Sequence, residues 1–275
     1  MNKRGYAFSM KAESWNAAKC APYLPKPKAS DHKYRRGVLG CITGSKQYPG
    51  AALLTTSAAL AVGIGMVRYF GPEEVKKAVV QNRPEVVIQT GNVKAYLLGS
   101  GIPAKKSLLR KMTMEMANRA DLPKVLDAGA LYLTGASKSP TIITPHAGEL
   151  AELLKVDSAK IEEDPIYYAL DAARRFKVTV LLKGNKTVVA NENRVIQLPA
   201  ATSWLATAGT GDVLAGILGA LIALNHEAVN KENLIELGAT ASYIHAQSAV
   251  HSSKGPIDAG KMIDHISKEV ARVSK

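Results

Sequence analysis

Short apolar runs alternate with helical segments along most of this chain, and this alternation constrains the fold more than any other feature. The runs are bounded by Gly, Pro or Asp, as buried strands usually are. Strands are expected at residues 37–43, 85–89, 95–99, 124–128, 141–144 and 178–184. Near-continuous apolar strands that alternate with helices indicate a mostly parallel central sheet covered by helices on both faces, which is an α/β fold.

Three further segments complete this outline. A helix is expected to begin at Pro49, whose missing N–H costs nothing in a first turn, with a strand after it. Two alternating runs within 186–198 flank the turn sequence NEN and predict a hairpin, and the chain from Gly209 onward reads as mostly helical. We expect a single domain over residues 1–275, in which 1–33 form an N-terminal arm and 34–275 form the α/β core.

The composition excludes several classes of protein. The chain has 275 residues, of which 47% are hydrophobic and 5% aromatic, so it is neither disordered nor fibrous. Cys20 and Cys41 form no CxxC pair, and we expect neither a disulfide framework nor a zinc cluster. The N-terminal stretch lacks the apolar core of a secretory signal, and the run 51–67 reads as a buried helix followed by a strand. A cytoplasmic protein without membrane association is therefore expected.

The net charge of +13 is unevenly distributed. Residues 1–40 carry +7, residues 41–130 carry +6, and residues 131–275 are neutral overall. A basic N-terminal half suits an anionic ligand and could attract nucleic acid non-specifically, although a solvated basic surface is the more common explanation of such charge. The basic residues are not interleaved with aromatic ones, so we expect no specific nucleic-acid site.

Polar, glycine-containing loops follow five of the expected strands. In open parallel sheets, ligands bind outside the carboxyl ends of the strands. The sequence therefore predicts one long site at that edge, built from loops at residues 43–45, 99–101, 127–129, 144–149 and 183–185.

The stretch ATAGTGDVLAGILGAL, residues 206–221, is the strongest candidate for chemistry in the chain. Its apolar residues recur at helical spacing, so a helix begins near Gly209 to Asp212. Gly209 and Gly211 let a ligand approach the backbone, and free N–H groups at a helix start bind anions. The helix dipole is expected to keep Asp212 ionised as a proton acceptor, although an acid in a first turn can also be merely structural.

Two other positions suit a phosphate ligand or a substrate. Lys183 ends a buried strand and can meet phosphate charge, with the Thr187 hydroxyl nearby. In TPHAGEL, Thr144 is expected to cap a helix, and His146 suits either a substrate contact or a capping role. The remaining histidines lack metal-ligand spacing and are expected to be structural or exposed, namely His32, His226, His245, His251 and His265. A helix-start anion site beside an acid indicates phosphoryl transfer.

These motifs resemble, in their order, those of the ADP-dependent NAD(P)H-hydrate dehydratases, a branch of the ribokinase-like superfamily. The resemblance covers roughly Lys33 to Val250. AGTGD marks the wider superfamily, whereas YPGAA, TPHAGE and KGNKT are typical of the dehydratases. The motifs LLGSG, VLDAGAL, IITPHAGEL, LLKGNKTVV and ATAGTGDVLAGI complete the match.

The resemblance implies a hydro-lyase of metabolite repair. Such an enzyme restores NADH or NADPH from the 6-hydroxylated (S) hydrate. A phosphoryl group from ADP or ATP passes to the ring hydroxyl and then leaves as phosphate, giving AMP where ADP is the donor. Mg²⁺ is expected, with the phosphates as its main ligands and without a cluster of protein side chains that surrounds it.

The resemblance also implies roles for individual residues. Asp212 is the expected base, and Gly209, Thr210 and Gly211 are the expected anion hole. The residues expected to line the nucleotide site are Lys183, Gly184, Asn185, Lys186, Thr187 and Gly211. The residues expected to hold the hydrated cofactor are Ala51, Gly99, Gly101, Asp127, His146, Glu149 and Asp212.

The sequence departs from the family pattern at three points. Ala208 stands where many members have Gly, Ser100 where many have Pro, and TSWLAT where many have NPGMAT.

The forty residues before the first strand are too few for the epimerase domain that is often fused ahead, so a separate epimerase is the expected partner, and a homo-oligomer is expected. The alternatives are a small-molecule kinase of the same superfamily and a nucleotide-binding regulator without turnover.

Overall fold

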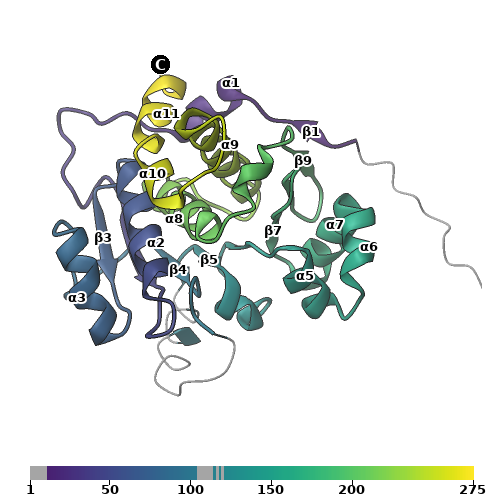
Figure 1. Cartoon of the computed structure of the whole chain (residues 1–275), viewed down its shortest axis with the longest axis horizontal. Helices are drawn as coiled ribbons and strands as arrows, with labels where there is room; N and C mark the ends of the chain where they lie inside the picture. The colour runs from purple at the N-terminus through teal and green to yellow at the C-terminus, as the bar shows by residue number, and fades with distance from the viewer. Residues whose placement is uncertain (1–10, 104–113, 116–117, 119–120) are drawn as a thin grey trace, which may run out of the picture.

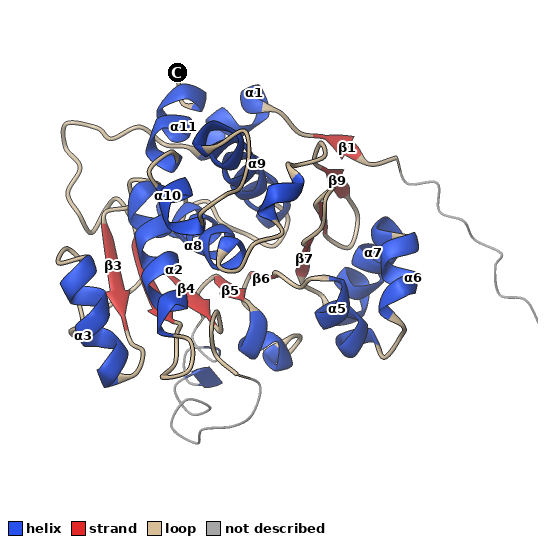
Figure 2. Cartoon of the chain, viewed as in Figure 1, coloured by secondary structure: helices blue, strands red, loops and turns tan. Residues whose placement is uncertain are grey.

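A nine-stranded sheet forms the centre of the computed structural model, which describes residues 11–103, 114–115, 118 and 121–275 (Figures 1 and 2). The strand order is β1-β9-β8-β7-β6-β5-β4-β2-β3. Neighbouring strands are parallel except at β8, which runs antiparallel to β7 and to β9. The strands are β1 Glu13–Ser14, β2 Val38–Ile42, β3 Met66–Tyr69, β4 Ala95–Leu98, β5 Lys124–Leu126, β6 Thr141–Ile143, β7 Thr179–Leu182, β8 Val188–Ala190 and β9 Val195–Gln197.

Helices cover both faces of this sheet because its strands are apolar on both sides. Successive residues of a strand point to opposite faces, so Leu97 packs in one apolar core and Leu98 in the other. The first core lies under α1 Ala17–Cys20, α2 Pro49–Ala61, α3 Glu73–Asn82, α8 Thr210–Leu224, α9 Leu234–Ser252, α10 Ala259–Ile263 and α11 Ile266–Val273. The second lies under η2 Ala128–Leu133, α5 Ala147–Leu154, α6 Ser158–Glu163 and α7 Pro165–Phe176. The predicted α/β fold is confirmed.

Several predicted elements appear close to their expected positions. The helix that begins at Pro49 is α2, and the strand after it is β3. The hairpin predicted within 186–198 is formed by β8 and β9. The helix predicted from the GTGD stretch is α8, which is buried along most of its length. None of the helices that the structure describes is both long and apolar enough to cross a membrane.

The strand predicted at 85–89 is wrong. Val87 makes an isolated parallel bridge with Arg68, and the segment does not continue as a strand. The Arg68 side chain explains the break, because its Nη1 donates to the carbonyl oxygens of Gln89 at 2.8 Å and Thr90 at 3.3 Å. These carbonyls therefore bind a side chain instead of a neighbouring strand, and β3 is the last strand on this side of the sheet.

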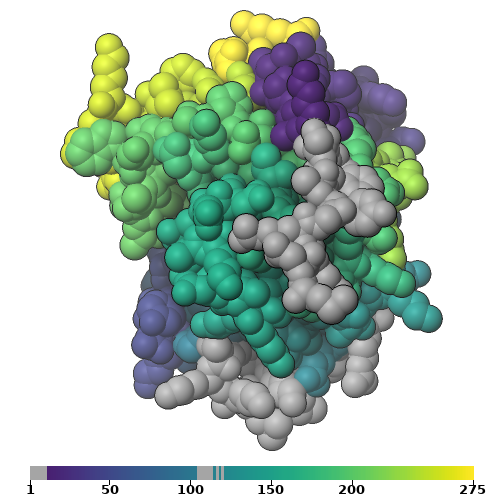
Figure 3. All heavy atoms as spheres, turned by 90° about the vertical axis from the view of Figure 1, so that its right-hand side faces the viewer, coloured from purple at the N-terminus to yellow at the C-terminus, as the bar shows by residue number. Residues whose placement is uncertain are grey.

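The described part of the N-terminal arm, residues 11–33, is attached to the sheet. Its strand β1 pairs with β9, and the Trp15 side chain is buried in the first core. Arg194 holds the arm through a two-pronged ion pair with Glu13, at 2.9 and 3.0 Å, and also pairs with Glu236 of α9. Figure 3 shows the arm lying beside the C-terminal helices. Residues 1–10 lie outside the described part of the chain.

Replacing Arg194 with Met is expected to loosen the arm and destabilise the fold. The Glu236 side chain is only 11% exposed, so removing its cationic partner leaves a poorly solvated charge. We expect the free energy of unfolding in urea to fall by about 1–3 kcal/mol. Arg35→Met is the matched control, because Arg35 is exposed and lies 4.0 Å from Asp31. Equal stability of the two variants would contradict the role given to Arg194.

Candidate active site

Two cavities flank the start of α8 at the carboxyl edge of the sheet. One, here called the Lys183 cavity, has a volume of about 430 Å³ and includes Thr210 and Gly211 in its wall. The other, here called the Asp212 cavity, has a volume of about 600 Å³ and includes Gly209 and Asp212. Successive residues of one helix start therefore face two different cavities.

The backbone at the start of α8 is held in place by its own turn. Gly209 caps the helix with φ of 91°, a left-handed conformation that favours glycine. The Thr210 hydroxyl donates to the carbonyls of Leu205 at 2.8 Å and Thr207 at 2.9 Å, so it is not directed at a ligand. Within the described residues, the N–H groups of Gly209, Gly211 and Asp212 have no hydrogen-bond partner, whereas the Thr210 N–H donates to the carbonyl oxygen of Thr207 at 3.4 Å. These three N–H groups are the ones available to an anion.

Asp212 is more easily protonated than the sequence predicted. The fold raises the pKa of Asp212 to about 7: burial is the largest cause, the charge of Asp127 adds to it, and Lys183 opposes both effects. The expectation that the helix dipole keeps this acid fully ionised is therefore wrong near neutral pH, because the loss of solvent outweighs the dipole. A pKa near the working pH is what an efficient general base requires.

Lys183 lies among three carboxylates. Its Nζ is 3.3 Å from Asp127 Oδ1 and 3.6 Å from Glu149 Oε2, and Asp212 also acts on it electrostatically. Burial lowers the pKa of Lys183, but these carboxylates outweigh burial, so the pKa is raised above its ordinary value. The side chain is thus a permanent cation in the wall of the Lys183 cavity.

His146 caps α5, which confirms one of its two expected roles. Its Nδ1 accepts the Glu149 N–H at 3.2 Å, and Glu149 Oε2 accepts the His146 N–H at 2.8 Å. The prediction that Thr144 caps this helix is wrong, because its hydroxyl instead donates to Asp127 Oδ1 at 2.7 Å. The His146 side chain is 60% exposed, and its contact with a substrate stays a prediction.

The structure divides the predicted site residues between the two cavities and leaves some of them outside both. The predicted nucleotide residues in the wall of the Lys183 cavity are Lys183, Gly184, Asn185, Thr187 and Gly211, whereas Lys186 does not line it. The predicted substrate residues in the wall of the Asp212 cavity are Ala51, Gly101 and Asp212. The others line neither cavity, namely Gly99, Asp127, His146 and Glu149. Gly101 fits closely there, since a Cβ on it would lie 2.2 Å from the Ala51 Cβ.

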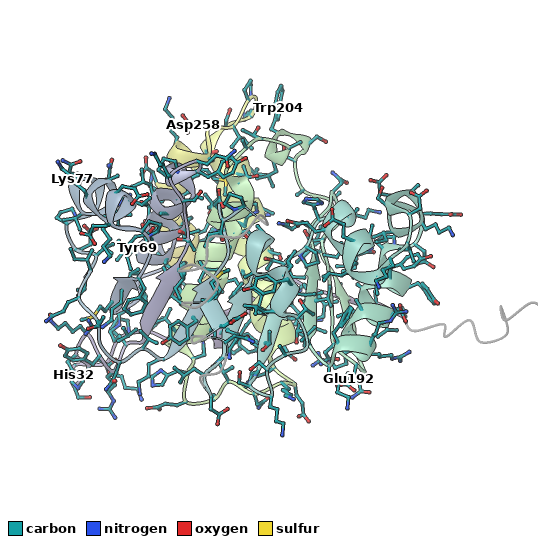
Figure 4. The ribbon with its side chains drawn as sticks, turned by 90° about the horizontal axis from the view of Figure 1, so that it is seen from below. His32, Tyr69, Lys77, Glu192, Trp204 and Asp258 are labelled. Atoms are coloured by element: carbon teal, nitrogen blue, oxygen red, sulfur yellow. The ribbon has the colours of Figure 1, made fainter. Side chains whose placement is uncertain are left out.

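The departures at Ala208 and TSWLAT fall on different cavities. Ala208 lines the Asp212 cavity. Thr202, Ser203 and Leu205 line the Lys183 cavity, so the TSW substitution borders the predicted nucleotide side and not the substrate side. Trp204 is 47% exposed and projects outward from the surface (Figure 4).

His245 is a site residue that the sequence analysis did not identify. It lines the Lys183 cavity from α9, and its Nε2 lies 2.9 Å from the carbonyl oxygen of Thr210. The fold lowers the pKa of His245 to about 4, because burial outweighs the opposing effect of the bond to Thr210. The ring is therefore neutral at pH 7 and donates from Nε2 to the first residue of α8. No local sequence motif identifies His245 as a site residue, because its contact with Thr210 joins residues 35 positions apart.

His245→Gln is expected to make stability less sensitive to acid. The unfolded chain protonates this ring below pH 6.5, whereas the folded protein resists until about pH 4. The wild-type free energy of unfolding should therefore fall as the pH drops through this window, by about 3 kcal/mol from this ring. Urea unfolding at pH 7 and pH 5 samples part of this window, and the wild type should lose about 2 kcal/mol more than the variant between these two pH values. An equal loss in the variant would show that His245 does not titrate as described.

A family model described as NAD(P)H-hydrate dehydratase matches residues 39–272. The chain is 36% identical over 274 residues to the bifunctional NAD(P)H-hydrate repair enzyme of Mycobacterium leprae, covering 93% of this chain and 55% of that protein. It thus spans about half the length of that relative. It is 32% identical to the ADP-dependent (S)-NAD(P)H-hydrate dehydratase of Neisseria meningitidis, covering 74% of this chain and 75% of the relative.

Solved structures show the same architecture. The ADP/ATP-dependent NAD(P)H-hydrate dehydratase of Bacillus subtilis, co-crystallised with ATP and Mg²⁺, superposes with a TM-score of 0.84 at 26% identity, covering 96% of this chain and all of that chain. A ribokinase-like superfamily protein of Enterococcus faecalis superposes with a TM-score of 0.84 at 19% identity, covering 96% of each chain, which supports the ribokinase-like fold.

Proposed function

Because this chain belongs to the NAD(P)H-hydrate dehydratase family, we propose that it dehydrates the (S) hydrate of NADH or NADPH with ADP or ATP as phosphoryl donor. The observation that supports the proposal is that both cavities share the start of α8 as part of their walls. Asp212 faces one cavity, while Gly211 and Lys183 face the other. A hydroxyl and a phosphoryl donor bound in the two cavities would meet at this helix start.

The chemistry assigns each group a task. Asp212 accepts the proton of the hydroxyl on ring carbon 6 as that oxygen attacks the terminal phosphorus of the nucleotide. The free N–H groups at the start of α8 and the Lys183 cation stabilise the transferring phosphoryl group. The C–O bond at carbon 6 then breaks and releases phosphate, the proton on carbon 5 passes to solvent, and the electrons of that C–H bond form the double bond between carbons 5 and 6. The products are NAD(P)H, phosphate and, from ADP, AMP.

The described residues contain no group of three or more His, Cys, Asp or Glu that is arranged to hold a metal ion. Asp127 and Glu149, two carboxylates beside Lys183, already pair with its ammonium group. We therefore propose that any Mg²⁺ enters with the nucleotide, whose phosphates supply most of its ligands.

Three further proposals rest on the family resemblance. We propose that an NAD(P)H-hydrate epimerase works with this chain, that the chain forms a homo-oligomer, and that it acts in the cytoplasm. Light scattering of the purified protein during gel filtration would test self-assembly, and a monomer at micromolar concentration would contradict it.

Gly211→Ala is expected to weaken nucleotide binding without unfolding the protein. A Cβ at this position would meet only Lys183 Nζ, at 3.8 Å, so the fold has room for it. The methyl group would, however, stand where phosphates approach the helix start. We expect the KM for ADP to rise about tenfold, from the loss of about 1.4 kcal/mol. Gly50→Ala is the control, because Gly50 lines the other cavity with open space around it. A larger rise in the control would contradict the assignment of the cavities.

Product analysis separates dehydration from simple phosphorylation. With hydrated NADH and ADP, we expect one phosphate and one AMP for each NADH formed, with no phosphorylated cofactor remaining. A stable phosphorylated cofactor would identify a kinase instead and overturn the proposed function.

A further inference from the structure

One buried carboxylate, that of Asp127, receives donors from three neighbouring strand-end loops. The Ser100 hydroxyl after β4 donates to Oδ2 at 2.8 Å, and the Thr144 hydroxyl after β6 donates to Oδ1 at 2.7 Å. Lys183 after β7 donates to Oδ1 at 3.3 Å. Asp127 itself follows β5 and is 3% exposed, so the ends of four adjacent strands converge on one anion.

This arrangement leaves the Asp127 carboxylate little freedom to rotate. Both of its oxygens are occupied, and a buried carboxylate loses several kcal/mol without such partners. Glu149, another carboxylate near Lys183, lies farther from Nζ, at 3.6 Å, and its Oε2 also accepts the His146 N–H at 2.8 Å. Asp127 is therefore the group best placed to fix the direction of the Lys183 side chain.

The Lys183 ammonium group is held close to the start of α8. An added Cβ on Gly211 would lie 3.8 Å from Lys183 Nζ, so the cation stands beside a residue that carries one of the three free N–H groups. A displacement of Asp127 would move the cation away from the position where it and the helix start act on the same phosphate.

We propose that Asp127 is a positioning residue, which the hydroxyls of Ser100 and Thr144 lock in the orientation that holds Lys183 beside the start of α8. The inference rests on the proposed function only in naming the anion as a nucleotide phosphate.

Nucleotide binding tests this proposal without any turnover. Calorimetric titration with ADP and with adenosine would compare the wild type, Ser100→Ala and Thr144→Val. We expect both variants to bind ADP about three- to tenfold more weakly, because a charge-assisted hydrogen bond is lost. Adenosine has no phosphate for Lys183 to meet, so its affinity should not change. Ser248→Ala is the control, since Ser248 is fully buried and its hydroxyl has no partner in the described chain.

Each outcome of the titration decides the proposal. ADP affinity in both variants within twofold of the Ser248→Ala control would overturn it. An equal loss of ADP and adenosine affinity would overturn it too, because that result indicates a distorted cavity. If Ser100→Ala fails to fold, Thr144→Val still tests the inference, since valine keeps the shape of threonine. Failure of the wild type to dehydrate hydrated NADH would refute the proposed function and leave this test intact.

The pH dependence of turnover supplies a second readout. The charged or titratable groups around Asp127 are Lys183 after β7, Glu149 and His146 at the start of α5, and Asp212 on α8. Asn keeps an oxygen that can accept from Thr144 and Lys183 but removes the charge that raises the pKa of Asp212, so Asp127→Asn should move the acid limb of the kcat profile to lower pH. An unmoved limb, or a shift to higher pH, would contradict the charge assigned to Asp127.

Discussion

Replacing Asp212 with Asn is expected to lower kcat by about 10²- to 10⁴-fold, the usual contribution of a general base. Asn keeps the shape of the side chain and cannot accept the hydroxyl proton. Nucleotide binding should remain, because the free N–H groups and Lys183 are unchanged. Steady-state rates together with an ADP titration measure both effects. A kcat within threefold of the wild type would exclude Asp212 as the base.

The same substitution is expected to stabilise the protein above pH 7. Asp212 has an ordinary pKa of 3.8, which the fold raises to about 7 mainly through burial. The folded state therefore holds this proton more tightly than the unfolded chain does, and stability is lost as the pH rises from about 3.8 to about 7. Asn avoids this cost, which we estimate at about 2–4 kcal/mol. Urea unfolding at pH 8 should show a more stable variant, and no gain there would mean that the folded site does not disfavour the ionised carboxylate.

The second large effect is expected for Lys183→Met, which should lower kcat/KM for ADP by about 10²- to 10³-fold. Methionine keeps the apolar stem and removes the cation that faces the phosphates. Because Lys183 lowers the pKa of Asp212, its loss should also move the acid limb of the kcat profile to higher pH. This direction is opposite to that expected for Asp127→Asn.

Lys160→Met is the control for the lysine substitution, because Lys160 lies exposed on α6. A comparable loss of kcat/KM in the control would contradict the specific role of Lys183. A shift of the acid limb to lower pH in Lys183→Met would contradict the electrostatic coupling between Lys183 and Asp212.

Local sequence signals predicted the parts of the site that depend on neighbouring residues. The two glycines and the helical spacing of GTGDVLAGIL located the start of α8, and apolar runs located most strands. The prediction of a strand at 85–89 failed because the side chain of Arg68, 21 and 22 residues earlier in the chain, binds the carbonyls of Gln89 and Thr90.

Contacts between distant segments could not be predicted in this way. Asp127 receives donors from Ser100, Thr144 and Lys183, which the fold brings together from different strand ends. His245 reaches the start of α8 across 35 residues. The raised pKa of Asp212 depends on burial, which is a property of the assembled structure.

The most direct test of the proposed function is the recovery of reduced cofactor. The purified protein would be incubated with (S)-hydrated NADH, Mg²⁺ and either ADP or ATP, and the return of the dihydronicotinamide absorbance would be followed. We predict recovery that requires the nucleotide and is abolished in Asp212→Asn. No recovery with either nucleotide, or equal recovery without any nucleotide, would contradict the account.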